Sequence, residues 1–123
     1  MLRRSDGFTL IELMTTMSVL GILAAVALSH FKSYQTRAFD ARAENDLHTA
    51  ITAEEAYFAD NESYVACSNV DCETQFEAFT LSMGTEITMT VVGTARFFQG
   101  EAYHPKGDKR FTYDSTTNSY TAS

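Results

Sequence analysis

The sequence is short of proline and of basic residues. One proline stands among 123 residues, so the chain fits a single small domain without a low-complexity tail. Nine lysines and arginines face sixteen acidic residues, and the formal net charge is −7. An excess of negative charge repels phosphate backbones, so we expect no nucleic-acid partner. The small basic group of Lys106, Lys109 and Arg110 is typical of an ordinary solvated turn.

The chain also lacks the residue patterns of known enzyme classes. It has no Ser/His/Asp or Cys/His set, no metal-ligand spacing and no glycine-rich phosphate loop. Its three histidines, His30, His48 and His104, are scattered along the chain. We therefore expect neither an enzyme nor a bound cofactor or metal.

One apolar run dominates the N-terminal part of the chain. Phe8 to Leu28 carries a single charge, at Glu12, and is long enough, at roughly 20 residues, to cross a hydrocarbon core. Arg3 and Arg4 precede the run. The positive-inside bias then puts the N-terminus in the cytoplasm and the remainder of the chain outside it.

An ordinary secretory signal has a similar layout. Ala25-Val26-Ala27 supplies a small-residue pattern that a signal peptidase would cut before Leu28. The product of that cut would be a secreted, soluble binding protein. Two observations count against this alternative: Glu12 interrupts the apolar run, and helical character continues beyond the run without a breaker.

The pattern after the apolar run predicts that the helix continues. No glycine or proline occurs from Ser29 to Asp60, and good helix formers dominate. We predict one helix from Phe8 to near Asp60. An apolar stripe on its second half recurs at spacings of three and four: Phe39, Ala43, Leu47, Ala50, Ile51 and Phe58. Acidic side chains are expected to solvate the remaining surface: Asp40, Glu44, Asp46 and Glu55.

After Gly84 the periodicity changes from helical to alternating. Residues 86–91, 94–103 and 110–113 have the pattern of strands, with a possible further strand at 119–121. Short turns between consecutive strands favour an antiparallel meander. The predicted fold class is α+β, with a long N-terminal helix whose second half packs against an antiparallel sheet of three to four strands.

The two cysteines, Cys67 and Cys72, lie in a polar stretch beyond the membrane-crossing segment. Outside the cytosol a disulfide between them is the expected state. Zinc binding is the alternative, although one cysteine pair without nearby partners is a weak metal pattern. A bridge across so short a loop would mainly fix the shape of that loop.

The segment Gly7-Phe8-Thr9-Leu10-Ile11-Glu12-Leu13-Met14 resembles the prepilin cleavage motif of type IV pilins and of the pseudopilins of type II secretion. The resemblance implies a pilin fold and a structural subunit that prepilin peptidase cuts after Gly7 and N-methylates at Phe8. It implies three parts: a leader at 1–7, a transmembrane and filament-core helix half at 8–34, and a globular pilin domain at 35–123. Loss of the leader removes two arginines and one aspartate, which takes the net charge from −7 to −8.

The resemblance also implies that Glu12 guides assembly. A charged side chain within an apolar helix costs about 2.5 kcal/mol or more, and less near a helix end. We expect Glu12 to pair with the Phe8 amine of a neighbouring subunit, which would permit a single axial offset between the two helices. The alternative is an acid near the helix end that reaches the lipid headgroups.

The implied partners are identical subunits in a helical filament, the peptidase, the inner-membrane assembly platform and, before assembly, membrane lipid. The chain is then expected first in the inner membrane, with its N-terminus in the cytoplasm, and later in an extracellular pilus of the kind used in cell adhesion and motility.

Two variants of this hypothesis remain open. Major pseudopilins are known as a family for calcium in a C-terminal loop, and Asp108 and Asp114 would be oxygen ligands for it. An aromatic set is similar in spacing to that of short pilins proposed to conduct electrons: Phe8, Phe31, Tyr34, Phe39, Phe58 and Tyr64. Aromatic residues on a packed helix are usually core or interface material, and a globular domain would separate such rings between subunits.

Overall fold

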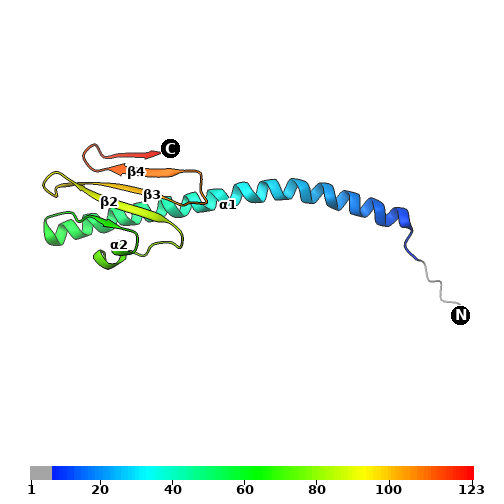
Figure 1. Ribbon diagram of the computed structural model, residues 1–123, viewed down its shortest axis with the longest axis horizontal. Coiled ribbons are helices and arrows are strands. Elements are labelled where there is room, and N and C mark those ends of the chain that lie inside the picture. The colour runs from blue at the N-terminus through cyan, green and yellow to red at the C-terminus, as the bar shows by residue number, and fades with distance from the viewer. Residues whose placement is uncertain (1–6) are drawn as a thin grey trace. The chain divides into compact units, whose positions relative to one another are not determined.

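A single helix, α1, is the longest element of the computed structural model, which describes residues 7–123. It runs from Leu10 to Asn61 and continues through Gly21 without a break (Figure 1). The predicted long helix is therefore confirmed. The absence of proline and glycine after Gly21 explains its length, because no residue in that stretch lacks a backbone N–H or adds unusual backbone freedom.

Residue contacts divide the chain into two units after Tyr34. In the N-terminal unit every residue from Gly7 to Tyr34 is exposed. The C-terminal unit, from Gln35 to Ser123, contains the remainder of α1, the short helix α2 (Val70–Gln75) and the strands.

Five strands form one antiparallel sheet in the order β1-β2-β3-β4-β5, so each strand pairs with its neighbours in sequence. Their bounds are Cys67–Ser68, Glu86–Val92, Phe97–Tyr103, Arg110–Asp114 and Ser119–Ala122. The meander is confirmed, and the sheet has one strand more than the three to four predicted. The additional strand is β1, whose two residues are too few to show an alternating pattern.

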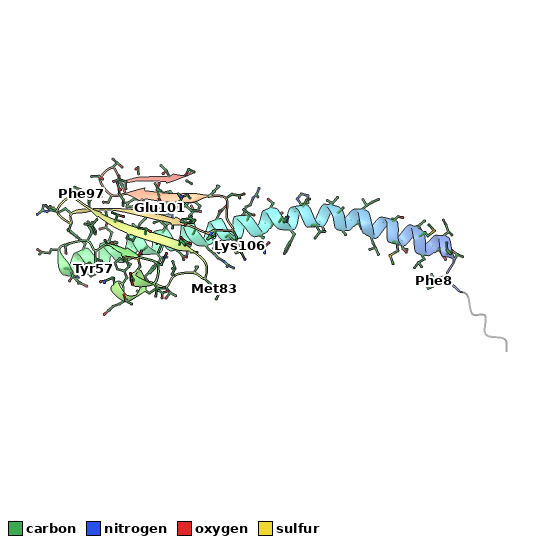
Figure 2. The ribbon with its side chains drawn as sticks, viewed as in Figure 1. Phe8, Tyr57, Met83, Phe97, Glu101 and Lys106 are labelled. Atoms are coloured by element: carbon green, nitrogen blue, oxygen red, sulfur yellow. A yellow bond between two sulfur atoms is a disulfide. The ribbon has the colours of Figure 1, made fainter. Side chains whose placement is uncertain are left out.

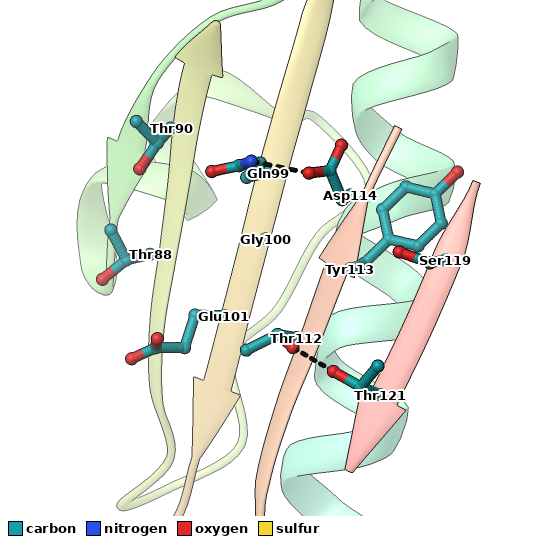
Figure 3. A pocket seen from close by; sticks show the side chains of 10 residues that line it. All are labelled: Thr88, Thr90, Gln99, Gly100, Glu101, Thr112, Tyr113, Asp114, Ser119 and Thr121. Atoms are coloured by element: carbon teal, nitrogen blue, oxygen red, sulfur yellow. Dashed lines mark hydrogen bonds between the residues drawn. The ribbon is translucent and has the colours of Figure 1, made fainter. Parts of the chain in front are cut away.

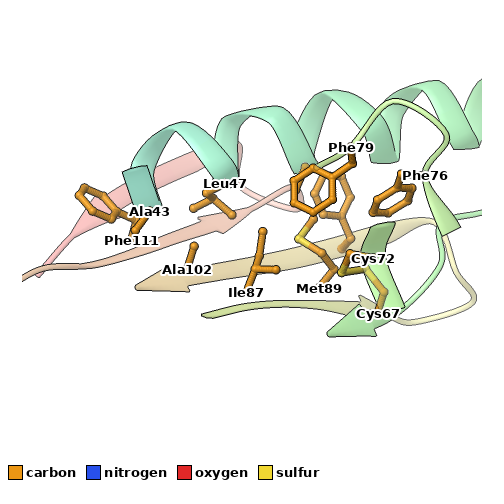
Figure 4. Close-up of a cluster of buried hydrophobic side chains, with 12 residues drawn as sticks. Ala43, Leu47, Cys67, Cys72, Phe76, Phe79, Ile87, Met89, Ala102 and Phe111 are labelled. Atoms are coloured by element: carbon orange, nitrogen blue, oxygen red, sulfur yellow. A yellow bond between two sulfur atoms is a disulfide. The ribbon is translucent and has the colours of Figure 1, made fainter. Parts of the chain in front are cut away.

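The core lies between residues 35–61 of α1 and one face of the sheet (Figure 4). Alternation along the strands sends Ile87 and Met89 of β2, and Phe98 and Ala102 of β3, into this layer. Gly100 of β3 also faces α1, because a Cβ atom built there would lie 2.8 Å from Leu47 Cδ1. Glycine at this position therefore lets the helix and the sheet approach closely.

Two acids of α1 that were expected to solvate its surface are buried, so that prediction is wrong for Asp40 and Asp46, which are 8% and 2% exposed. Asp40 Oδ1 accepts the backbone N–H groups of Asp108 and Lys109 at 2.9 and 3.0 Å. Asp46 accepts the backbone N–H and the hydroxyl of Ser82 at 3.0 and 2.8 Å. Each carboxylate thus ties a loop to the helix, and these bonds compensate for burial of the charge.

A third acid of α1, Glu54, is fully buried. Its Oε2 accepts the backbone N–H of Val65 at 3.3 Å, while its Oε1 has no hydrogen-bond partner among residues 7–123. Burial raises the pKa of Glu54 to about 7, against a lowering by the Val65 hydrogen bond and with a smaller rise from the charge of Glu55. The folded state therefore favours the protonated carboxyl of Glu54.

The stability of the C-terminal unit is expected to fall as pH rises from about 4.5, the ordinary pKa of a glutamate, to about 7, its pKa in the folded chain. The folded state binds the proton more tightly than the unfolded state, so protonated Glu54 stabilises the fold fully below pH 4.5, and this contribution is lost above pH 7. The loss amounts to about 3 kcal/mol. Glu54→Gln, which resembles the protonated form, should remove this pH dependence.

The measurement is unfolding of the full chain in detergent micelles at several pH values, followed by loss of the β-sheet signal. Glu77→Gln is the matched control, because Glu77 is exposed and is not among the groups that shift the pKa of Glu54, so this variant should keep the pH dependence of the wild type. Equal pH profiles for Glu54→Gln and the wild type would contradict the prediction.

Candidate functional site at the start of the long helix

Thr9 and Glu12 cap the N-terminus of α1. The backbone N–H and the hydroxyl of Thr9 each donate to Glu12 Oε2 at 2.9 Å, and the Glu12 N–H donates to Thr9 Oγ1 at 3.3 Å. This reciprocal arrangement is a capping box, which satisfies N–H groups that have no partner inside the helix. Sequence reasoning missed it, although a threonine three residues before a glutamate is a recognisable signal for such a cap.

Gly7 and Phe8 precede this cap outside the helix, and both are exposed. The Phe8 side chain is 94% exposed, and a Cβ atom built on Gly7 would meet nothing within 4 Å. No described residue therefore covers the backbone between these two residues. The predicted leader extends into residues 1–6, and these, with Arg3 and Arg4, lie outside the described residues.

The apolar side chains of α1 in the N-terminal unit are exposed, and no described residue packs over them. By length and composition α1 is the one helix among residues 7–123 suited to cross a membrane. An exposed apolar surface of this extent is typical of a contact with lipid or with other protein chains. Large apolar residues that contribute to it include Leu10, Ile11, Leu13, Leu20, Ile22, Leu23 and Leu28.

Cys67 and Cys72 form a disulfide, as predicted. The bridge joins β1 to α2, and Cys72 is fully buried in the core (Figure 4). Asn69, between them, accepts the backbone N–H of Ile87 through its side-chain oxygen at 2.9 Å. The bridged loop is thus fixed against β2.

The other candidate ligands are not brought together. His48 stacks on Tyr120, and His104 stacks on Phe39. Asp108 lies before β4 and Asp114 ends it, so these two acids lie at opposite ends of one strand. From Gly7 to Ser123 there is no group of three or more His, Cys, Asp or Glu side chains that could hold a metal ion. In the aromatic set, Phe58 stacks on Tyr64 with ring centroids 4.6 Å apart.

The outer face of the sheet has a shallow, open hollow of about 460 Å³ (Figure 3). Its polar groups pair with one another: Gln99 donates to Asp114 at 2.7 Å, and the hydroxyls of Thr112 and Thr121 lie 2.5 Å apart. Hydrogen bonds from Thr116 and Gln99 hold the pKa of Asp114 below its usual value. The polar groups of the hollow are thus paired within the sheet.

Comparison with known proteins agrees with the geometry at the helix start. Residues 2–28 match the prokaryotic N-terminal methylation motif. The type IV major pilin protein PilA of Myxococcus xanthus is 38% identical over 66 residues, which cover 54% of this chain and 30% of that protein. The type IV wide pilus major component PilA4 of Thermus thermophilus is 37% identical over 65 residues, which cover 53% of this chain and 50% of that protein. The chain thus spans half or less of the length of these two relatives.

A longer match covers both units. The fimbrial protein EcpC of Eikenella corrodens is 30% identical over 126 residues, which cover 91% of this chain and 82% of that protein. The methylation motif lies at the capped start of α1, and the α+β fold follows it. With a relative matched over most of both chains, the chain belongs to the type IV pilin family.

Proposed function

We propose that this chain is a structural subunit of a type IV pilus, anchored in the inner membrane before assembly and packed by its apolar half-helix into the filament afterwards. The observation that carries the proposal is the uncovered apolar surface of α1 from Leu10 to Leu28, at whose N-terminal end stands the carboxylate of Glu12. Lipid covers such a surface before assembly, and the same segments of other subunits cover it in the filament. Each large apolar side chain then contributes about 1.5 to 3 kcal/mol when it is fully removed from water.

Processing precedes assembly in this proposal. Prepilin peptidase cuts after Gly7 and methylates the new amine of Phe8. The exposure of both residues supports this step, since a peptidase needs an accessible backbone. In the membrane the amine lies on the cytoplasmic side, beside the assembly platform.

Glu12 sets the register between subunits. Its carboxylate pairs with the Phe8 amine of a neighbouring chain, and a slipped neighbour leaves both charges unpaired in apolar surroundings. The bonds from Thr9 support this role, because they occupy one carboxylate oxygen, Oε2, while no described residue bonds Oε1. One carboxylate oxygen of Glu12 thus accepts hydrogen bonds within its own helix, and the other is left to accept one from a neighbouring subunit.

The alternatives receive less support. The relatives from Myxococcus and Thermus are named as type IV pilus components, which favours a pilus over a pseudopilus of type II secretion. Because Asp108 and Asp114 lie at opposite ends of β4, the two carboxylates do not form one calcium-binding loop. A secreted soluble protein would need a cut before Leu28, inside the continuous helix α1.

The mature chain is expected to begin with N-methylated Phe8. Gly7→Val should block the cut and leave residues 1–7 attached, because a branched side chain would enter the peptidase at the cleavage point. The measurement is the intact mass and the N-terminal sequence of the wild-type protein and of both variants, purified from the source cells. Gly21→Ala is the control, since a Cβ atom there also meets nothing within 4 Å and processing should be normal. A mature N-terminus at Leu28 would contradict both the proposed cut after Gly7 and the proposal that the chain is a pilus subunit.

A further inference from the structure

The cations of the C-terminal unit gather at one end. Arg37 and Arg42 lie on the first turns of α1 within this unit, while Lys106 and Lys109 lie in the turn between β3 and β4. We call these four residues the basic end. Arg96 stands apart from them, in the turn between β2 and β3. Figure 2 shows Lys106 at one end of the unit and Phe97, the neighbour of Arg96, at the other.

The fold builds the basic end around the Phe39 ring. Lys106 Nζ lies 5.9 Å from the centroid of that ring, and Arg42 Cζ lies 5.5 Å from it. The ring of His104 stacks on Phe39 with centroids 4.2 Å apart. Asp40 holds the same turn through the backbone N–H groups of Asp108 and Lys109. Segments more than 60 residues apart thus present their charges together.

Among the described residues, the cations of the basic end form no ion pair with a carboxylate. Arg110, which follows the turn, pairs with Glu101. Within residues 7–123 no carboxylate oxygen lies within 4 Å of a side-chain nitrogen of Arg37, Arg42, Lys106 or Lys109, and all four are exposed. Two acids accompany the four cations: Asp108 in the same turn, which is exposed, and Asp40, whose buried carboxylate is bonded to the backbone of that turn. The formal charge of the basic end is therefore +2.

We infer that the basic end binds the headgroups of anionic phospholipids while the chain is anchored in a membrane. The inference rests on the proposed anchorage. Arg37 stands nine residues after Leu28, the end of the apolar run, so on a helix the basic end starts about 14 Å beyond the hydrocarbon core. The headgroup layer takes up about half of that distance. Basic residues next to a membrane segment gain about 1 kcal/mol each from an anionic surface, within a Debye length of about 8 Å.

Charge segregation also explains how an acidic chain tolerates that surface. The formal net charge of −7 would repel anionic lipid if the acids faced it. With four cations at the basic end, the part of the unit that follows the membrane segment carries a net positive charge, and repulsion from more distant acids weakens with distance and with salt.

The test uses the full chain in nanodiscs of phosphatidylcholine, with or without phosphatidylglycerol, that contain a lipid with a gadolinium-labelled headgroup. The readout is paramagnetic broadening of the amide signals of Gly107, at the basic end, and of Gly93, in the turn beside Arg96. Phosphatidylglycerol should broaden the Gly107 signal severalfold more than phosphatidylcholine alone, and added salt should reverse the effect. The Gly93 signal should change little.

Two pairs of substitutions separate charge from folding. Arg42→Gln with Lys106→Gln removes two cations that contact Phe39, while Arg37→Gln with Lys109→Gln removes two whose side chains contact no described ring. Each pair should remove most of the severalfold phosphatidylglycerol preference, because each cation contributes about 1 kcal/mol of attraction to an anionic surface. Arg96→Gln is the matched control and should behave as the wild type.

Equal broadening of Gly107 with and without phosphatidylglycerol would overturn the inference. Broadening that follows the number of chains per disc, and not the lipid, would overturn it in favour of a second copy as the partner. Failure of the chain to insert into either kind of disc would instead refute the anchorage, and the inference would fall with it.

Discussion

Replacement of Glu12 by glutamine is expected to abolish filaments while the subunit is still inserted and processed. Glutamine at this position retains the capping box, because its side-chain oxygen accepts the same N–H and hydroxyl of Thr9. It lacks the charge that we propose pairs with the Phe8 amine of the next subunit. An ammonium left unpaired in an apolar interior costs about 3 to 5 kcal/mol, which lowers the yield of docked subunits by at least about a hundredfold.

The measurement is the number of sheared filaments by electron microscopy, together with the amount of processed subunit in the membrane. Thr9→Val is the matched control, because it removes the hydroxyl of the cap and keeps the carboxylate. It should weaken the helix start by about 1 kcal/mol and leave filaments present. Glu12→Ala, which loses both cap and charge, should fail like Glu12→Gln, and Glu12→Asp should be partly defective. Normal filament yield from Glu12→Gln, at normal subunit levels, would reduce Glu12 to a helix cap.

Truncation of Leu47 to alanine is expected to destabilise the C-terminal unit by about 3 kcal/mol, because a fully buried leucine is replaced by a cavity. Gly100→Ala alone should also destabilise it, by about 1 to 3 kcal/mol. Its new methyl group would lie 2.8 Å from Leu47 Cδ1 and 3.0 Å from Met89 Sδ, closer than packed atoms allow.

The two substitutions together should cost less than the sum of their separate effects. The methyl group at Gly100 would enter the space that Leu47 vacates, so we expect a coupling of about 1 kcal/mol or more. Unfolding of the full chain in detergent micelles measures all four members of the cycle. Gly21→Ala, which lies in the other unit, should be additive with Leu47→Ala. Additivity of Gly100→Ala and Leu47→Ala would show that glycine is not required there for helix packing.

The long helix and the strand order could be predicted because they depend on neighbours in sequence. An apolar run, followed by spacings of three and four and then by alternation, is a local pattern that each segment carries without the others. The disulfide was predictable for the same reason, since Cys67 and Cys72 lie five positions apart. Strand β1 was not, because its two residues become a strand only through pairing with Met89 and Thr88 of β2.

The acids of α1 show where such reasoning fails. By periodicity alone, Asp40 and Asp46 belonged to the solvated surface, yet the sheet and its loops cover them. Their partners lie 68 and 36 residues away, at Asp108 and Ser82. A helix wheel reports which residues share a face, and it does not report which loops will cross that face.

The sequence by itself determined the membrane-length apolar helix, the motif at Gly7 to Met14 and the α+β class, since each is a local pattern of hydrophobicity and residue type. Tertiary structure alone decided the burial of Glu54, the close approach at Gly100 and the gathering of cations around Phe39. Each of these depends on contacts between segments distant in the chain. The free energies of burying polar groups and apolar surface arise only when the sheet packs on the helix and both lose water.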